Sequence, residues 1–169
     1  MRRIIITAGM ALGVLAATPL SVEAAGSVDV TFTNPQRYRD IGDRYASRRS
    51  RVLKEVESYF NYLGDRYLKD GQVLSIEVLN IDLAGQYEPW RFEFRDVRIM
   101  RDITPPRFKL RYALVDRGKL LMRAEENVTD MTYLWGAGSI YGDQRLGYEK
   151  KMLREWFRRR FVRLDPPRG

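Results

Sequence analysis

Cationic side chains near the C-terminus of this 169-residue chain recur at the spacing of one helix face. Lys151, Arg154 and Arg158 are separated by three and four residues, so an α-helix would place them on one side. Guanidinium groups contact phosphate and carboxylate through paired hydrogen bonds, and the sequence therefore predicts an anion-binding surface at these three residues. The alternative is a solvated helix face whose cations lie favourably near the helix C-terminus.

Basic charge is concentrated in this part of the chain. The whole sequence has a formal net charge of +8, and the segment from Arg145 to Arg163 holds eight basic and two acidic residues. The remainder is close to neutral, so the charge indicates a local surface and not a basic molecule as a whole. Candidate ligands are lipopolysaccharide, phospholipid surfaces, acidic glycans and nucleic acid.

Histidine and cysteine are both missing from the sequence. Their absence excludes the ordinary zinc, copper and haem sites and the nucleophiles that depend on histidine. We therefore expect no metal and no cofactor, and we assign no catalytic residue. Carboxylates remain, and two of them could hydrolyse a glycoside. The available acids are Asp82, Asp96, Asp102, Glu125, Glu126 and Asp130, and their spacing singles out no two of them. Carboxylates such as Asp82, which lies among apolar residues, and Asp130 could serve a hydrolase; the alternative is that these acids are structural or solvated.

The first 24 residues have the pattern of a secretory signal peptide. Two arginines precede an apolar run over residues 4–20, and small residues follow at Ala24 and Ala25. This pattern predicts cleavage after one of these alanines and a single mature domain over residues 25–169. The alternative is an uncleaved membrane anchor, although the small residues favour cleavage. We therefore expect a periplasmic or secreted protein, in which envelope anions are closer to hand than nucleic acid.

The segment from Pro105 to Asp130 has the pattern of a β-hairpin. Apolar and polar residues alternate on both sides of residues 116–118, which predicts a three-residue loop with Gly118 in the left-handed region. Pairing Val115 with Lys119 brings the apolar side chains of both strands to one face. The same register pairs Phe108 with Glu126, Leu110 with Ala124, Tyr112 with Met122 and Leu114 with Leu120.

Further elements must cover and extend this hairpin. Alternation predicts strands at 27–32, 72–85 and 90–99, and a change of apolar phase at Val78-Leu79 predicts a bulge there or burial on both faces. Apolar stripes predict helices over about 43–69 and from Gly147 to about Arg163. The fold class is therefore α+β, with a mainly antiparallel sheet of about five strands and two helices packed on one face. The glycine-rich segment between Asp130 and Gly147 is expected to be a loop.

Several short motifs occur in an order that resembles a known family. They are Val30-Thr31-Phe32 with Pro35, Tyr38 and Asp40; Asp82-Leu83-Ala84-Gly85; Pro105-Pro106-Arg107; and Tyr148-Glu149-Lys150 with Trp156-Phe157. The chain resembles an exported proteobacterial family that is catalogued only as a domain of unknown function, number three thousand and sixteen. The resemblance covers the mature chain and implies a periplasmic or secreted protein. It carries over no catalytic or binding residue.

These observations favour a non-enzymatic protein that binds an anionic envelope component or a protein partner. The binding surface would be the exposed sheet face or the C-terminal helix. A carboxylate-dependent hydrolase and a structural subunit of an envelope complex are the alternatives. Two carboxylates in one pocket would favour the hydrolase. Exposed Trp90, Phe92, Phe94 or Trp135 on one patch would favour the subunit.

Overall fold

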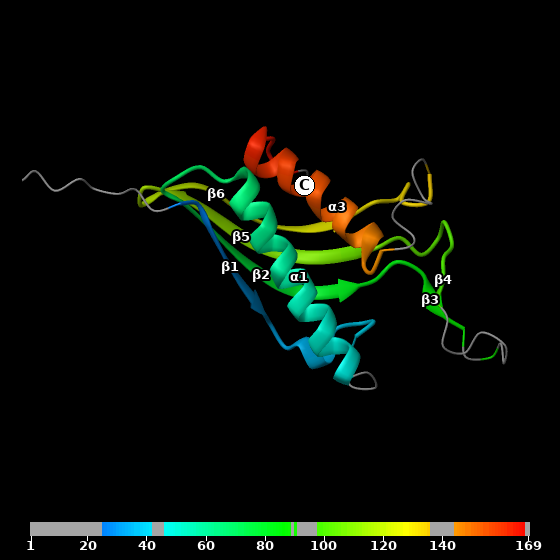
Figure 1. The fold of residues 1–169 in the computed structure, drawn as a ribbon. Helices are drawn as coiled ribbons and strands as arrows, with labels where there is room; N and C mark the ends of the chain where they lie inside the picture. The colour runs from blue at the N-terminus through cyan, green and yellow to red at the C-terminus, as the bar shows by residue number, and fades with distance from the viewer. Residues whose placement is uncertain (1–24, 42–45, 89, 91–97, 136–143, 168–169) are drawn as a thin grey trace, which may run out of the picture.

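A computed structural model describes residues 25–41, 46–88, 90, 98–135 and 144–167. Its strands are β1 (Ser27–Phe32), β2 (Gln72–Asp82), β3 (Gln86–Tyr87), β4 (Arg98–Ile99), β5 (Arg107–Asp116) and β6 (Lys119–Thr129). Its helices are α1 (Ala46–Tyr67) and α3 (Gly147–Phe157), which continues as a π-helical turn, Arg158–Val162, and a short 3-10 turn spans Pro35–Arg37. The predicted α+β class is confirmed (Figure 1).

The four long strands form one sheet in the spatial order β1-β2-β5-β6. β5 pairs antiparallel with both β2 and β6, whereas β1 runs parallel to β2. A parallel pair needs a crossover connection, and α1 supplies it between β1 and β2. The short strands β3 and β4 pair with each other in a separate small sheet near one end of the main sheet (Figure 1).

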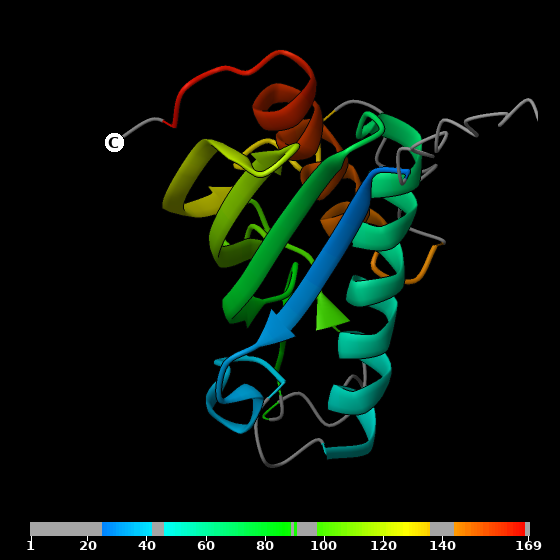
Figure 2. The same cartoon turned by 90° about the vertical axis from the view of Figure 1, so that its left-hand side faces the viewer.

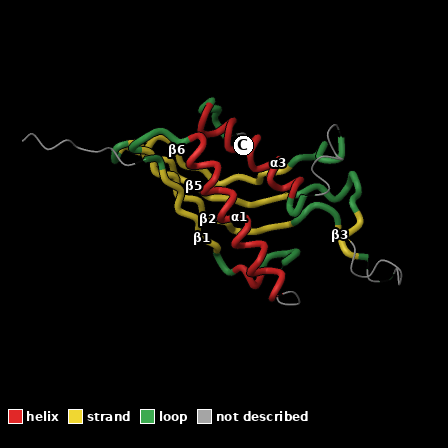
Figure 3. The backbone as a smooth tube through the Cα atoms, in the orientation of Figure 1, coloured by secondary structure: helices red, strands yellow, loops and turns green. Residues whose placement is uncertain are grey.

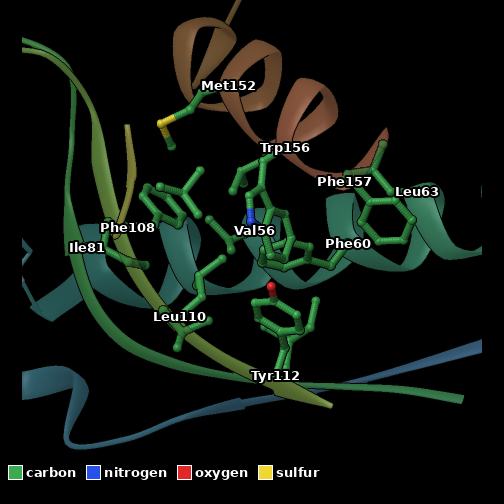
Figure 4. Packing of buried hydrophobic residues seen from close by; sticks show 14 of the residues in the cluster. Val56, Phe60, Leu63, Ile81, Phe108, Leu110, Tyr112, Met152, Trp156 and Phe157 are labelled. Atoms are coloured by element: carbon green, nitrogen blue, oxygen red, sulfur yellow. The ribbon is translucent and has the colours of Figure 1, made fainter. Parts of the chain in front are cut away.

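Both helices lie on the same side of the main sheet (Figures 2 and 3). Alternate residues of the central strands point toward them and are at most 2 % exposed: Leu74, Ile76 and Val78 of β2, and Phe108, Leu110, Tyr112 and Leu114 of β5. Val56, Phe60 and Leu63 of α1 and Met152, Trp156 and Phe157 of α3 complete this core (Figure 4). Burial of one such side chain contributes about 1.5–3 kcal/mol, so the core stabilises a chain that has no disulfide.

Trp156 lies where the two helices and the sheet meet (Figure 4). Its ring packs edge-on against those of Phe60 of α1, Tyr112 of β5 and Phe161 of the π-helical turn, with centroid distances of 6.2, 5.4 and 5.2 Å. Edge-to-face contacts at this range are favourable beyond the area they bury. Trp156 therefore fixes α3 against both α1 and the sheet.

Of the two explanations offered for the change of apolar phase in the second strand, the structure shows the bulge. The pairing of β2 with β5 shifts between Val78 and Asn80, and Leu79 is the additional residue. The shift moves the buried position from even to odd residues, so that Val78 and Ile81 are both fully buried. The side chain of Asp82 is thereby turned away from the helices, onto the open side of the sheet.

The predicted hairpin exists, but its predicted loop and register are wrong. Asp116 pairs with Lys119, which leaves a two-residue loop of Arg117 and Gly118, both with positive φ (48° and 80°). A bulge at Leu121 then shifts the pairing, so that Leu110 lies opposite Glu126 and Tyr112 opposite Ala124. The observed register differs from the predicted one by two residues. Because side chains alternate between faces at every residue, a shift of two leaves the same residues of β5 on the buried face.

Several other predictions concern residues that lie partly or wholly outside the described part of the chain. The strand predicted at 90–99 lies mostly outside them, and only its end is seen, as β4. The signal peptide, the first residues of the first helix and much of the predicted glycine-rich loop also lie outside. The second helix is confirmed from Gly147 through Val162, with a π-helical last turn.

Candidate functional site

Lys151, the first residue of the predicted anion-binding row, is held by acidic side chains. Its Nζ lies 2.8 Å from Oδ2 of Asp130, which follows β6, and 3.4 Å from Oε1 of Glu155. Side chains of Lys151 and Asp130 are only 19 % and 10 % exposed. Burial opposes the charge on Lys151, but the hydrogen bond and charge of Asp130 outweigh it and raise the pKa of Lys151. Lys151 is therefore part of an ion pair that joins α3 to the end of β6.

The other two residues of the predicted row differ from Lys151. Arg154 is partly buried and has an interaction partner of its own. Arg158, where α3 passes into the π-helical turn, is exposed. The structure thus does not bring the three cations together as one open row along the helix.

Arg158 instead belongs to a second group of cations at the end of the helix. Arg158, Arg159 and Arg163 are all exposed, and together with Glu155 they line a hollow of about 190 Å³. Within the described part of the chain, none of the three guanidinium groups makes an ion pair or a side-chain hydrogen bond. We refer to Arg158, Arg159 and Arg163 as the arginine cluster.

A buried ion pair fixes the direction of the arginine cluster. Arg160 points inward, and its Nε and Nη2 donate hydrogen bonds of 2.8 Å to the two carboxylate oxygens of Glu126 on β6. Glu126 also accepts hydrogen bonds from Nε1 of Trp156 at 2.6 Å and Oη of Tyr112 at 2.9 Å. With Arg160 and Phe161 buried, the flanking arginines of the turn are directed to solvent.

The electrostatics of this pair follow from its surroundings. The side chains of Glu126 and Arg160 are 9 % and 7 % exposed. Burial alone would raise the pKa of Glu126, but the hydrogen bonds from Arg160, Trp156 and Tyr112 lower it below its usual value. Glu126 is therefore ionised at neutral pH, and the pair holds the C-terminal turn on the sheet.

A polar cleft of about 390 Å³ lies beyond the end of β2. Asp40 and Asp82 line it together with the exposed arginines Arg39 and Arg107. Nε of Arg39 lies 3.6 Å from Oδ2 of Asp82. Burial raises the pKa of Asp82, and the charge of Arg39 only partly opposes this effect.

Asp40 has a structural role in this cleft. Its Oδ2 is 2.6 Å from Nη2 of Arg98 and accepts a hydrogen bond of 3.1 Å from the backbone N–H of Leu83. Arg98 also donates to the carbonyls of residues 83–85, and Oε1 of the buried Glu149 accepts from the N–H of Ala84 at 2.8 Å. These side chains satisfy the backbone of the loop that follows β2.

The two acids proposed for a hydrolase do not share this cleft. Asp82 faces the open side of the sheet near Arg39 and Arg107. Asp130 bonds Lys151 of α3, on the side of the sheet that the helices cover. The two acids have different partners and the cleft that contains Asp82 does not contain Asp130, so they are not seen as the pair of facing carboxylates that glycoside hydrolysis uses.

The open face of the sheet is charged. Arg111 on β5 lies between Glu77 of β2 and Glu125 of β6, at 2.6 and 2.8 Å, and Lys109 is 2.8 Å from the same Glu125. Trp90 and Trp135 are 66 % and 75 % exposed, but Phe92 and Phe94 lie outside the described residues. Nothing described here joins these tryptophans in one apolar patch.

Sequence reasoning missed the buried pair and part of the arginine cluster. The run Arg158-Arg159-Arg160 is visible in the sequence, and its helical spacing from Trp156 and Phe157 could have indicated that one arginine points inward. The ion-pair partner of Arg160 is Glu126. The predicted hairpin register places Glu126 opposite Phe108, whereas in the structure it lies opposite Leu110. This two-residue error leaves Glu126 on the covered face, so what the sequence did not indicate is which residue of the C-terminal turn reaches it.

Comparison with known proteins identifies the chain only at the level of a family. A family model described as "Protein of unknown function (DUF3016)" matches residues 26–159, and the chain belongs to this family. No curated protein and no solved structure matches. Among the described residues, no helix is long and apolar enough to cross a membrane.

Four of the segments that carry the family resemblance meet around the polar cleft. Asp40, the loop from Asp82 to Gly85, Arg107 and Glu149 either line it or bond the loop beside it. Most of these contacts satisfy buried backbone groups. The residues that carry the resemblance therefore close the end of the sheet, whereas the arginine cluster lies at the end of the second helix.

Proposed function

We propose that this protein is exported by a signal peptide over residues 1–24 and binds an anionic envelope component, without catalysis, in the periplasm or outside the cell. The arginine cluster is the binding surface. The observation that carries this proposal is that Arg158, Arg159 and Arg163 are exposed around one hollow and have no carboxylate partner in the described part of the chain.

The chemistry of the cluster favours phosphate or carboxylate groups. Three guanidinium groups and the single carboxylate of Glu155 line the hollow, so positive charge exceeds negative charge there and attracts an anion. Each guanidinium can donate two parallel hydrogen bonds to a phosphate or a carboxylate. The buried pair of Glu126 and Arg160 keeps the turn in place before a ligand arrives, so that little ordering is needed on binding. Phosphorylated lipid headgroups, including those of lipopolysaccharide, satisfy these requirements.

Co-sedimentation of the mature protein with lipopolysaccharide and with anionic phospholipid vesicles tests this proposal. The variant is Arg158→Ala/Arg159→Ala/Arg163→Ala. Its matched control, Arg37→Ala/Lys54→Ala/Lys119→Ala, removes the same charge from exposed positions elsewhere. Thermal unfolding of all proteins verifies that each variant is folded.

We expect the wild type and the control to bind at low salt and to release as the salt concentration rises. The cluster variant should lose at least tenfold in affinity. If the control loses as much as the cluster variant, binding depends on net charge alone and the cluster is not a site. If the wild type does not bind at low salt, the ligand is not an envelope anion and a protein partner must be sought.

The hydrolase is the weaker candidate. The polar cleft does contain two carboxylates, but Asp40 is held by Arg98 and Leu83, and this leaves Asp82 as the single carboxylate available there. A carboxylate mechanism needs a second group of this kind. The structure therefore favours binding over hydrolysis as the proposed function.

A further inference from the structure

The two edges of the main sheet are protected to different degrees. β1, at one edge, spans only Ser27–Phe32, and α1 packs against it. The contact is close because Gly64 of α1 faces Val28, where an added Cβ would lie 2.3 Å from Cγ2 of Val28. β6, at the other edge, spans Lys119–Thr129, contains no proline, and has β5 as its only neighbouring strand in the described part of the chain. An edge of this length presents unpaired backbone groups to another strand.

The C-terminal tail runs beside β6 without pairing with it. A groove of about 580 Å³ separates Asn127 and Thr129 of β6 from Pro166 and Pro167 of the tail. Neither proline has an N–H, so this part of the tail cannot complete the ladder of hydrogen bonds. The groove thus leaves the edge of β6 accessible over its second half.

Charges on β6 specify how a second copy would pair with it. Arg123 lies on the open side of the sheet and has no ion-pair partner among the described residues. In an antiparallel pair of identical strands centred on Ala124, Arg123 of each copy lies opposite Glu125 of the other. Centring on Arg123 or on Glu125 would instead place like charges directly opposite, which is unfavourable.

We infer that the protein forms a two-fold dimer in which the β6 strands of two copies pair antiparallel over Leu121–Asn127, centred on Ala124. This segment begins at the bulged residue of β6, and the rest of it pairs regularly with β5. Two further ion pairs, Arg123 with Glu125 of the second copy and the reverse, fix the register, and each Glu125 also keeps its contacts with Lys109 and Arg111 of its own chain. Met122 of each copy, which packs against the core of its own chain, lies opposite Glu126 of the other, at the side of the groove.

The dimer has a consequence for the orientation of the helices. Residues directly opposite in an antiparallel pair point to the same face, so the two sheets join with both helix layers on one side. Both arginine clusters then lie on that side of a continuous eight-stranded sheet. The inference itself does not rest on the proposed ligand, because it uses only the edge strand and its charges.

Disulfide trapping tests the register directly, because the chain has no cysteine of its own. Directly paired antiparallel residues have Cα atoms roughly 4.5–5.5 Å apart, which lies within the range that a disulfide spans. Ala124→Cys should therefore yield a covalent dimer under mild oxidation. The control Asn127→Cys places its two thiols about 20 Å apart, at about 3.3 Å for each of six residue steps, and should remain uncross-linked.

Charge reversal provides a second test that does not require cross-linking. Arg123→Glu and Glu125→Lys each place two like-charged pairs across the interface, and sedimentation velocity should show monomers for each variant alone. An equimolar mixture makes both pairs attractive again and should restore the dimer. A monomeric wild type with no Ala124→Cys cross-link would overturn the inference. Equal cross-linking of both cysteine variants, or a mixture that stays monomeric, would also overturn it.

Discussion

Glu126 and Arg160 are the two charged side chains of one buried ion pair between the sheet and the C-terminal turn. The pair is almost fully removed from water, and both oxygens of Glu126 are satisfied by hydrogen bonds. Such a pair adds little stability compared with apolar residues, but removing one partner leaves a buried charge uncompensated. At the residue scale, the position of the arginine cluster depends on this pair.

Glu126→Gln should therefore destabilise the protein strongly. We expect a loss of about 3–5 kcal/mol in the free energy of unfolding, because Arg160 remains buried and charged. The exposed pair of Glu77 and Arg111 provides the control, and Glu77→Gln should cost less than about 1 kcal/mol. Denaturant unfolding at neutral pH measures both. Similar losses in the two variants would show that Glu126 is not a buried partner of Arg160.

Glu126 should also make the stability of the protein depend on pH. The folded-state pKa of Glu126 is lowered, so its contribution to stability is fully present above its ordinary pKa of 4.5 and is lost as pH falls through the folded-state value. The wild type should therefore lose more stability below pH 4.5 than Glu126→Gln does. Thermal unfolding across the acidic range measures this difference, and parallel curves would contradict it.

The contribution of Glu149 to stability should depend on pH in the opposite direction to that of Glu126. Burial raises its folded-state pKa above 4.5, so the folded protein is penalised as pH rises from 4.5 toward the raised value. Glu149→Gln removes this penalty and can still accept the hydrogen bond from the N–H of Ala84. The melting temperature of the variant relative to wild type should increase between pH 4.5 and 7. A difference that does not change with pH would contradict this account.

At the scale of elements, the β5–β6 hairpin shows what the sequence did and did not predict. Alternation correctly identified the two strands and the buried face of β5. The loop was predicted one residue too long because Arg117 adopts a positive φ, which is uncommon for a residue other than glycine. The bulge at Leu121 has no sequence signal of its own, and together these two features displaced the predicted register by two residues.

Gly118→Ala measures the conformational requirement of this loop. Gly118 has a φ of 80°, and no atom lies within 4 Å of an added Cβ, so the substitution introduces backbone strain without a clash. We expect a loss of about 1–2 kcal/mol, the cost of a left-handed conformation for an L-residue. Denaturant unfolding tests the value. An unchanged stability would show that the two-residue loop does not have this geometry.

The second helix shows which contacts the spacing of residues in the sequence can predict and which it cannot. Its apolar residues Met152, Leu153, Trp156, Phe157 and Phe161 are all buried as their spacing predicted. Helical spacing also placed Lys151, Arg154 and Arg158 on one side, but it carried no information about which acids approach from other elements. Asp130 reaches Lys151 from the end of β6, 21 residues earlier in the chain.

At the scale of the whole molecule, the sequence predicted the α+β class and both helices on one face of the sheet. The parallel pairing of β1 with β2 follows from the helix between them and is compatible with a mainly antiparallel sheet. The polar cleft could not be predicted, because it joins segments that are far apart in the sequence. Only the pairing of strands and the packing of α3 bring Asp40, Asp82 and Glu149 to one end of the sheet.

Export is a further prediction at this scale. Expression of the full chain in a bacterium with an intact secretion system should release a protein that begins at Ala25 or Gly26, because cleavage is expected after Ala24 or Ala25. Intact-mass measurement of the exported fraction identifies the new N-terminus. A full-length protein held in the membrane fraction would instead support an uncleaved anchor.

The most direct test of the account compares two double variants that share neither substitution. Arg159→Ala/Arg163→Ala removes two members of the arginine cluster, and Lys151→Ala/Arg154→Ala removes the two residues of the helical row that the structure places outside it. Affinity for lipopolysaccharide is measured at low salt on variants shown to be folded. We predict that the first pair loses at least tenfold in affinity and that the second stays within about twofold of wild type. The reverse order would contradict the account, because the helical row would then be the binding surface.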